Sequence, residues 1–256
     1  MKRLSYMFAV VLAAALLAVA CGSDDDLGGG DLTLVTAGTL TVCTDSPYPP
    51  MEFERDGEFT GFDIELMRAI ADELGLDLVV NNTGFDPITS GLAMEAGDCD
   101  IAAASITINA EREQNIDFSD PYFTADQSLL VTKASGIKDL AGFAGRNLGV
   151  QSGTTGEIYA NANDPGATII SFENPGDLFT ALAAGQIDGV LQDIVPNAEQ
   201  ALNDDTVELV ETFETDEEYG FATKEEGAED VLEAVNAALQ KLRDNGTYDD
   251  IYDDWF

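Results

Sequence analysis

Short runs of β-branched and apolar residues alternate with stretches of helical periodicity from about residue 39 to the end of the chain. The first run, TLTVCT (39–44), predicts a strand, and apolar residues on one face of 62–74 predict a helix that ends at Gly75. The same patterns predict strands at 77–81, 100–105, 147–151, 167–172 and 188–193, and helices at 88–96, 174–185 and 229–244. This alternation is typical of an α/β fold with parallel sheets.

The motif Ala-x-x-Ala-Gly-x-x-Asp occurs at 93–100 and again at 181–188, each time leading into a predicted strand. The repetition suggests two similar lobes, although a Gly after a helix is expected in any case. Two β-like runs, 128–133 and 219–224, bracket the second series and are expected to cross between the lobes. We therefore predict a first lobe made of 39–130 and 222–256, with the end of the chain packed back on it, and an inserted second lobe, 131–221, joined by a hinge.

The N-terminus carries Lys2 and Arg3 ahead of an apolar run, about 7–20, that is too short to span a bilayer but is typical of a secretory signal. Small residues precede Cys21 and resemble the lipobox of bacterial lipoproteins, with Leu17 four rather than three residues before the cysteine. We predict a signal peptide over 1–20, lipidation of Cys21 and a flexible acidic linker over 21–38. The exported domain would then sit at the extracytoplasmic face of the membrane. An ordinary signal peptide cleaved beside a cysteine is the alternative.

Charge and composition exclude several classes of function. The chain has 256 residues with 11 Lys+Arg, 49 Asp+Glu and no His, a formal net charge of −38 that would repel nucleic acid. Without His, Ser-His-Asp and Cys-His catalysis and imidazole metal sites are excluded, which leaves carboxylate chemistry, carboxylate metal sites or binding. Of these we expect binding, with no catalytic residue, metal or cofactor. The acid excess fits a well-solvated surface and a high-salt habitat about equally.

Two further cysteines, Cys43 and Cys99, lie in predicted strands. We expect them to be small buried apolar side chains, with a disulfide between them as the less supported alternative. The chain has no C-x-x-C or other metal-ligand spacing.

Polar residues follow the first-lobe strands at the edge where ligands bind in open α/β sheets. Asp45 and Tyr48 come after the first strand, and Ser105 and Thr107 after the third, with Arg112 five residues further on. A guanidinium can hold a carboxylate through two parallel hydrogen bonds. Taken alone, the arginine is more simply explained by a surface ion pair with a neighbouring glutamate.

The second lobe offers a complementary set of groups. Gly153, Thr154 and Thr155 follow the strand 147–151 and open a helical stretch, where main-chain N–H groups and hydroxyls can bind an anion; an ordinary Thr N-cap is the alternative. Asp193 ends the strand 188–193 and can accept hydrogen bonds from an ammonium group, or can cap the next helix. One cation and one anion facing across a cleft suit a zwitterion.

Six motifs in order along residues 39–256 resemble the bacterial extracellular solute-binding proteins, family 3, the polar amino acid receptors of ABC importers. They are GFDIELMRAIADELG, the Asp-(x)11-Arg spacing of Asp100 to Arg112, IDFSDPYF, GVQSGTTG, GQIDGVLQD and LRDNGTYDDIYDDWF. The resemblance implies a two-lobed α/β periplasmic-binding-protein (Venus-flytrap) fold, with two parallel or mixed sheets joined by two hinge strands. It also implies a monomer that binds a free amino acid and delivers it to permease subunits.

The resemblance further implies a role for each candidate residue. Arg112, with Thr107 and Thr155, would bind the ligand α-carboxylate, and Asp193, with the main chain around Ser105, would bind the α-ammonium. Tyr48 and Phe85 would sandwich the ligand side chain, and Asp45 would contact it. Gln151 stands where a glutamine receptor can carry Lys, and Ala104 where receptors for basic amino acids often carry Ser. The pattern leans toward a cationic ligand, with glutamine or another polar amino acid next.

Two other hypotheses remain open at this stage. The same scaffold serves as an exported dehydratase or lyase in some relatives, but no carboxylate in the sequence stands out as its acid. A ligand-binding partner of a separate sensor protein is the third hypothesis.

Overall fold

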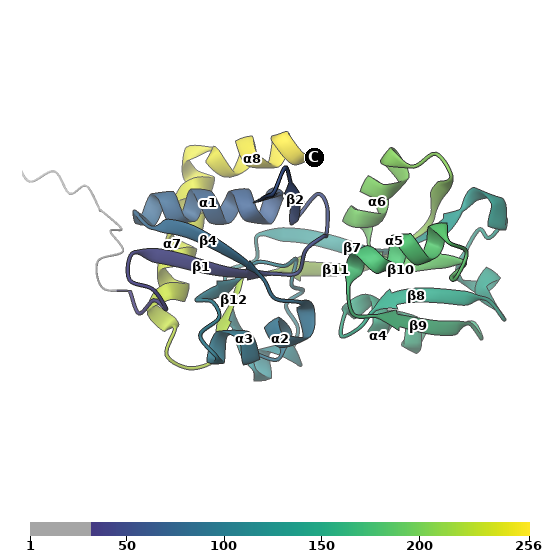
Figure 1. Ribbon diagram of the computed structural model, residues 1–256, viewed down its shortest axis with the longest axis horizontal. Helices are drawn as coiled ribbons and strands as arrows, with labels where there is room; N and C mark the ends of the chain where they lie inside the picture. Colours follow the sequence, from purple (N-terminus) through teal and green to yellow (C-terminus); the bar gives the residue numbers. More distant parts are fainter. Residues whose placement is uncertain (1–31) are drawn as a thin grey trace, which may run out of the picture.

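The computed structural model describes residues 32–256, which form two lobes seen at the left and right of Figure 1. The predicted signal peptide, Cys21 and residues 21–31 of the predicted linker lie outside the described residues. Among residues 32–256, no helix is long and apolar enough to cross a membrane.

The first lobe is built on a mixed five-stranded sheet with strand order β4-β1-β5-β12-β6. β1 pairs in parallel with β4 and β5, whereas β12 runs antiparallel to β5 and β6. Alternate residues of β1 enter opposite sides of the sheet, with Leu40 and Val42 in one core and Cys43 in the other. The strands of this sheet are β1 (Thr39–Thr44), β4 (Asp77–Asn82), β5 (Ile101–Ala102), β6 (Ile116–Phe118) and β12 (Ala222–Lys224).

Helices cover both faces of this sheet. α1 (Phe62–Leu74), α7 (Glu229–Asn245) and α8 (Thr247–Trp255) pack together over the larger core, and the hairpin of β2 (Phe53–Arg55) and β3 (Glu58–Thr60) adjoins them. The expected packing of the chain end on the first lobe is confirmed, since Ile251 and Trp255 pack against that core.

The opposite face of the first sheet carries α2 (Phe85–Thr89) and α3 (Leu92–Glu95) where one helix is predicted. Gly91 separates them at φ +77°, and a Cβ there would lie 2.6 Å from the Asn115 carbonyl oxygen. A close main-chain approach therefore requires the glycine and breaks the helix.

The second lobe has a five-stranded sheet with order β11-β7-β10-β8-β9, in which β8 pairs in parallel with both β9 and β10. α4 packs on one face of it, and α5 and α6 on the other. Its elements are β7 (Phe123–Thr132), β8 (Asn147–Gln151), β9 (Thr168–Phe172), β10 (Gly189–Asp193), β11 (Val207–Tyr219), α4 (Thr155–Ala162), α5 (Pro175–Ala183) and α6 (Ile194–Asn203). Short 3-10 turns are η1 (Arg112–Gln114), η2 (Lys133–Ser135) and η3 (Leu140–Phe143).

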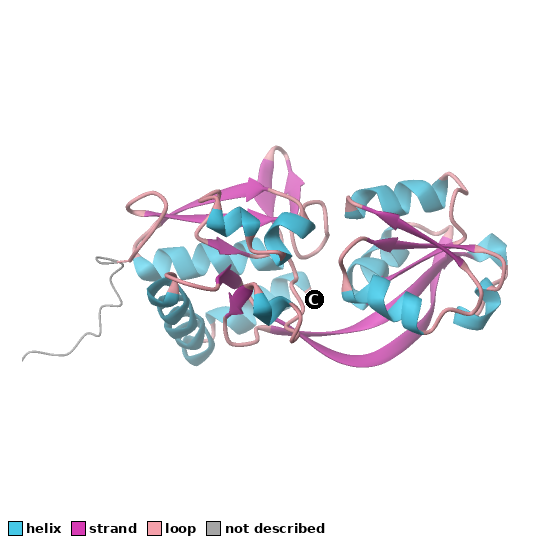
Figure 2. Ribbon diagram, turned by 90° about the horizontal axis from the view of Figure 1, so that it is seen from below, coloured by secondary structure: helices cyan, strands magenta, loops and turns pink. Residues whose placement is uncertain are grey.

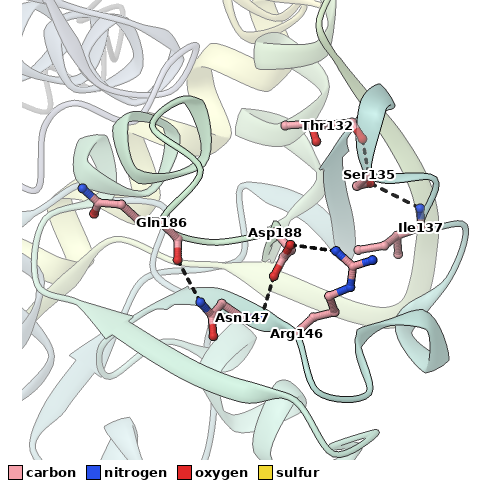
Figure 3. A network of polar contacts seen from close by, with 7 residues as sticks. All are labelled: Thr132, Ser135, Ile137, Arg146, Asn147, Gln186 and Asp188. Atoms are coloured by element: carbon pink, nitrogen blue, oxygen red, sulfur yellow. Dashed lines mark hydrogen bonds and ion pairs between the residues drawn. The ribbon is translucent and has the colours of Figure 1, made fainter.

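The repeated motif ends in an aspartate that accepts a hydrogen bond from the main chain of a strand in each lobe. Asp188 accepts a hydrogen bond from the main-chain N–H of Asn147, at the start of β8, and pairs with Arg146 (Figure 3). In the first lobe, Asp100 accepts from the main-chain N–H of Thr41 in β1 at 2.8 Å. Each aspartate thus ties the start of one strand, β5 or β10, to the strand that pairs with it in parallel, β1 or β8, which supports the inference of two similar lobes.

Two long strands, β7 and β11, join the lobes, as the paired ribbons in Figure 2 show. Ala125 lies in the first-lobe core, whereas Gln127 already pairs with β10 of the second sheet. On β11, residues 214–216 oppose the single residue Asp126 of β7. The crossing therefore lies at Asp126 and 214–216. The crossings predicted at 128–133 and 219–224 are placed too late in the chain, because the Thr-Lys ends of these runs mark their apolar parts and not the bend.

The first lobe also begins earlier than expected. Leu32 and Leu34 pack against its core, and the main-chain N–H of Val35 donates to Asp100 at 2.6 Å. Residues 32–38 are therefore part of the lobe and not of a linker.

Cys43 and Cys99 form a disulfide, with their Cα atoms 5.6 Å apart. The expectation of two free buried thiols is wrong, because the parallel pairing of β1 with β5 brings the two residues together across a separation of 56 residues. The bond closes a loop that contains α1, β4 and α2.

We predict that the double variant Cys43→Ala/Cys99→Ala loses about 2–5 kcal/mol of unfolding free energy, because a chain without the cross-link gains more entropy on unfolding than a cross-linked one. Denaturant titration of the variant against the oxidised protein measures the difference. Added reductant should weaken the wild-type protein and leave the variant unchanged. Equal unfolding free energies for the two oxidised proteins would contradict a structural role for this disulfide.

Candidate functional site

A small, partly open cavity lies between the lobes and is lined by side chains from both. Its volume is about 20 Å³, which is room for little more than a water molecule. An amino acid can therefore enter only if the lobes separate. The lining residues are Asp45, Tyr48, Glu52, Phe85, Ala104, Ser105, Thr107, Arg112, Gln151, Thr154, Thr155, Gln192 and Asp193.

Nine of the ten predicted site residues line this cavity. The tenth, Gly153, does not line it but contacts the lining residue Arg112. The carbonyl oxygen of Gly153 accepts a hydrogen bond from Arg112 at 3.2 Å. The structure thus brings together residues that lie as much as 148 positions apart in the sequence, from Asp45 to Asp193.

Arg112 is buried, with 6% of its surface exposed, in the 3-10 turn η1. Its guanidinium donates to the carbonyl oxygens of Thr107 (2.7 Å) and Gly153 (3.2 Å) and lies 5.0 Å from the centre of the Phe85 ring. Within residues 32–256, it makes no ion pair with a carboxylate. The surface ion pair considered from sequence is therefore wrong. The buried guanidinium retains donors for an anionic group.

The three threonines divide into two roles. Thr154 caps α4, since its hydroxyl accepts from the main-chain N–H of Glu157 at 3.2 Å, as the N-cap alternative proposed. The hydroxyls of Thr107, from the first lobe, and Thr155, from the second, lie 3.5 Å apart across the cleft. This pair, rather than Thr154, offers side-chain donors where the lobes meet.

Asp193 turns its carboxylate into the cleft and does not cap α6, so the N-cap alternative is wrong for this residue. It accepts from the Tyr48 hydroxyl at 3.0 Å, from the Tyr219 hydroxyl and from the Gln127 amide. Burial raises the pKa of Asp193 to about 6, and the nearby Glu217 charge adds to the rise, while these three hydrogen bonds oppose it.

Asp45 and Gln151, from different lobes, meet in the lining of the cavity. The Gln151 side-chain amide donates to Asp45 across the cleft at 2.6 Å. Burial raises the pKa of Asp45 to about 6, and that hydrogen bond opposes the rise. Phe85 packs on the Arg112 guanidinium, so it positions the arginine as well as lining the cavity.

Ser105 adopts a left-handed main-chain conformation, φ +49°, which is unusual for a residue other than glycine. Its main-chain N–H donates to Asp63 at 2.9 Å, and its hydroxyl donates to Glu52 at 3.2 Å. Asp63 also accepts from the Tyr122 hydroxyl, and burial raises the pKa of Asp63 to about 7. These bonds hold Ser105 in a strained conformation at the cavity wall.

Sequence reasoning missed four polar residues around the cavity. Glu52 and Gln192 line it, and Gln127 and Glu217 bond to residues that do. Gln127 offered no signal, since it lies between Asp126 and Ser128, just before the β-like run 128–133. Glu217 offered none, because acids occur throughout the β11 sequence.

A two-lobed α/β fold with a charged cavity between its lobes defines the class of hinged ligand-binding proteins, and comparison with known proteins gives the family. Residues 40–256 match the bacterial extracellular solute-binding proteins, family 3. The chain belongs to this family.

Individual relatives agree with this assignment. The ABC transporter glutamine-binding protein GlnH of Bacillus subtilis is 32% identical over 269 residues, covering 100% of this chain and 97% of the relative. An ancestral arginine-binding protein solved with glutamine bound is 38% identical, with a TM-score of 0.79, covering 86% of this chain and 99% of that one. The ancestral amino acid-binding protein AncCDT-1, described as a precursor of cyclohexadienyl dehydratase, is 38% identical, with a TM-score of 0.78 and coverage of 86% and 96%. The resemblance drawn from sequence is thus confirmed for the family and for the two-lobed fold.

We predict that the contribution of Asp45 to stability falls as the pH rises from about 4 to about 6, because folding raises the pKa of Asp45 from 3.8 to about 6. The folded chain then holds this proton more tightly than the unfolded chain, so its stabilising effect is lost as the group ionises. In Asp45→Asn, the decrease in unfolding free energy over this pH range should be smaller by an amount on the order of 3 kcal/mol. Thermal midpoints across this pH range measure it, with the exposed Asp249→Asn as the control. Parallel pH profiles for wild type and Asp45→Asn would contradict the assignment.

Proposed function

We propose that this chain is the exported, lipid-anchored receptor of an ABC importer, which binds a polar L-amino acid between its lobes and delivers it to the permease. The observation that carries the proposal is a buried guanidinium, Arg112, without a carboxylate partner among the described residues, lining the same cavity as the carboxylate of Asp193. The relatives bind amino acids, which supports the same conclusion.

The zwitterionic part of an amino acid matches the charges of the cavity. Its carboxylate would pair with Arg112 and accept from Thr155, and its ammonium would donate to Asp193. Charge-assisted hydrogen bonds contribute about 1.5–3 kcal/mol each. Micromolar affinity needs only about 8 kcal/mol. Three or more such bonds with an aromatic contact are therefore sufficient.

The remaining groups favour a cationic side chain on the ligand. Asp45 and Glu52 line the cavity together with the aromatic rings of Tyr48 and Phe85, which attract cations through their faces. Arg112 is the one cationic side chain among the lining residues, so a second carboxylate on the ligand would find no further cation and would share the cavity with three acids. Arginine or lysine fits these groups best, and glutamine, which can bond to Asp45 and Gln151 through its amide, comes next.

Binding between the lobes also gives the permease a means to recognise loaded receptor. A ligand that contacts both lobes stabilises the closed arrangement over the open one by its difference in affinity for the two. Lipidation at Cys21 would hold the receptor at the membrane in spite of a charge that removal of Lys2 and Arg3 with the signal peptide makes 9 − 49 = −40. Catalysis is not part of the proposal, since the relatives GlnH and the ancestral arginine-binding protein are named as binding proteins.

A thermal-shift screen of the chain against the standard amino acids at high salt tests the proposal. A ligand at a hundred times its dissociation constant should stabilise the protein by about 2.7 kcal/mol. We expect the largest shift with arginine or lysine. No shift with any amino acid would contradict the proposal, and turnover of an aromatic precursor would favour the dehydratase alternative.

We predict that Arg112→Ala weakens binding of the best ligand by about 2–5 kcal/mol, because the ligand carboxylate would be buried without a cation. Titration calorimetry measures the change. Arg68→Ala, which removes an exposed arginine paired with Glu65, is the matched control and should bind as wild type does. Unchanged affinity in Arg112→Ala would remove the carboxylate assignment.

A further inference from the structure

Glu217 lies on the hinge strand β11, where it bonds to both of the threonines that meet across the cleft. We propose that Glu217 is a built-in competitor of the ligand carboxylate, which occupies the hydroxyls of Thr107 and Thr155 and holds the lobes together until an amino acid displaces it. This inference rests on the proposed function, since it takes those two hydroxyls as ligand contacts.

The bend in β11 aims this side chain into the cleft. Residues 214–216 form a bulge opposite Asp126, and the Asp126 carboxylate accepts from the main-chain N–H groups of Thr215 (2.9 Å) and Asp216 (3.1 Å). Pairing then resumes with Glu217 opposite Ala125. Bulges near binding sites commonly redirect one side chain, and here the redirected side chain is Glu217.

The contacts of Glu217 come from both lobes. Its Oε2 accepts from the Thr107 hydroxyl at 2.6 Å and from the Thr155 hydroxyl at 2.7 Å, and its Oε1 accepts from the Gln127 amide at 2.9 Å. Thr107 belongs to the first lobe and Thr155 begins α4 of the second. One carboxylate oxygen therefore bridges the two lobes directly.

Glu217 and a ligand carboxylate cannot both accept hydrogen bonds from Thr107 and Thr155 at the same time. A threonine hydroxyl has one hydrogen to donate, and for both residues the Glu217 oxygen, at 2.6 and 2.7 Å, is a nearer acceptor than the other threonine, at 3.5 Å. An incoming carboxylate needs the same two hydrogens and would also lie beside a second negative charge. Glu217 must therefore release the threonines before they can bind the ligand.

Exclusive occupation has a defined effect on affinity. Molecules held by Glu217 cannot bind, so the apparent Kd is the intrinsic Kd multiplied by one plus the ratio of held to free molecules. Removing the charge should lower the apparent Kd, whereas a group that assisted the ligand would raise it on removal. The sign of the change thus separates a competitor from a ligand contact.

Two measurements on the full chain in mild detergent test the inference. In the first, calorimetry with the amino acid from the screen should give a Kd about 10-fold lower for Glu217→Gln than for wild type. Glu218→Gln, which removes the same charge from the adjacent exposed residue, should bind as wild type does. In a Thr155→Val background the gain from Glu217→Gln should shrink, because one of the contested hydroxyls is gone. An unchanged or higher Kd in Glu217→Gln would overturn the competitor role.

The second measurement needs no amino acid. Nitroxide labels at positions 92 and 158, exposed residues on opposite sides of the groove between the lobes, report lobe separation by pulsed EPR. Without ligand, Glu217→Gln should shift the distances to longer values than wild type or Glu218→Gln. Identical distances in all three would overturn the bridging role. A chain that binds no amino acid contradicts the proposed function instead, so the two failures are distinguished.

Discussion

The Arg112 guanidinium is buried between two main-chain carbonyls and the Phe85 ring, with no carboxylate paired to it among the described residues. Burial of a charge is costly unless a partner compensates, and burial accordingly lowers the pKa of this guanidinium from its usual value. The nearby charges of Asp193 and Glu217 offset that effect. The binding role proposed for the cleft depends on this arrangement, since a guanidinium without a direct ion pair can bind the carboxylate of a ligand.

The hinge determines whether the charged groups of the two lobes lie together. Arg112, Tyr48 and Asp45 belong to the first lobe, whereas Asp193 and Thr155 belong to the second, so the site is complete only when the lobes are together. The two strands that cross between them bend at one position of β7 and one bulge of β11. A small change at these positions can therefore assemble or separate the whole site.

The sequence predicted the regular elements better than the connections between them. The helix at 62–74 and the strand at 147–151 have the predicted bounds, because helical periodicity and buried apolar runs are local signals. β11 was missed, since its acids alternate along an exposed hinge and resemble a solvated loop. The Cys43–Cys99 bond and the bridge made by Glu217 depend on strand register, which no local pattern records.

In the proposed complex, the two lobes hold the zwitterionic part of an amino acid between Arg112 and Asp193. The most direct measurement is a crystal structure of the chain with the amino acid that gives the largest thermal shift. We expect the ligand carboxylate within hydrogen-bond distance of the Arg112 guanidinium and of Thr155, and the ligand ammonium within hydrogen-bond distance of Asp193. A ligand bound elsewhere, or with its carboxylate directed away from Arg112, would contradict it.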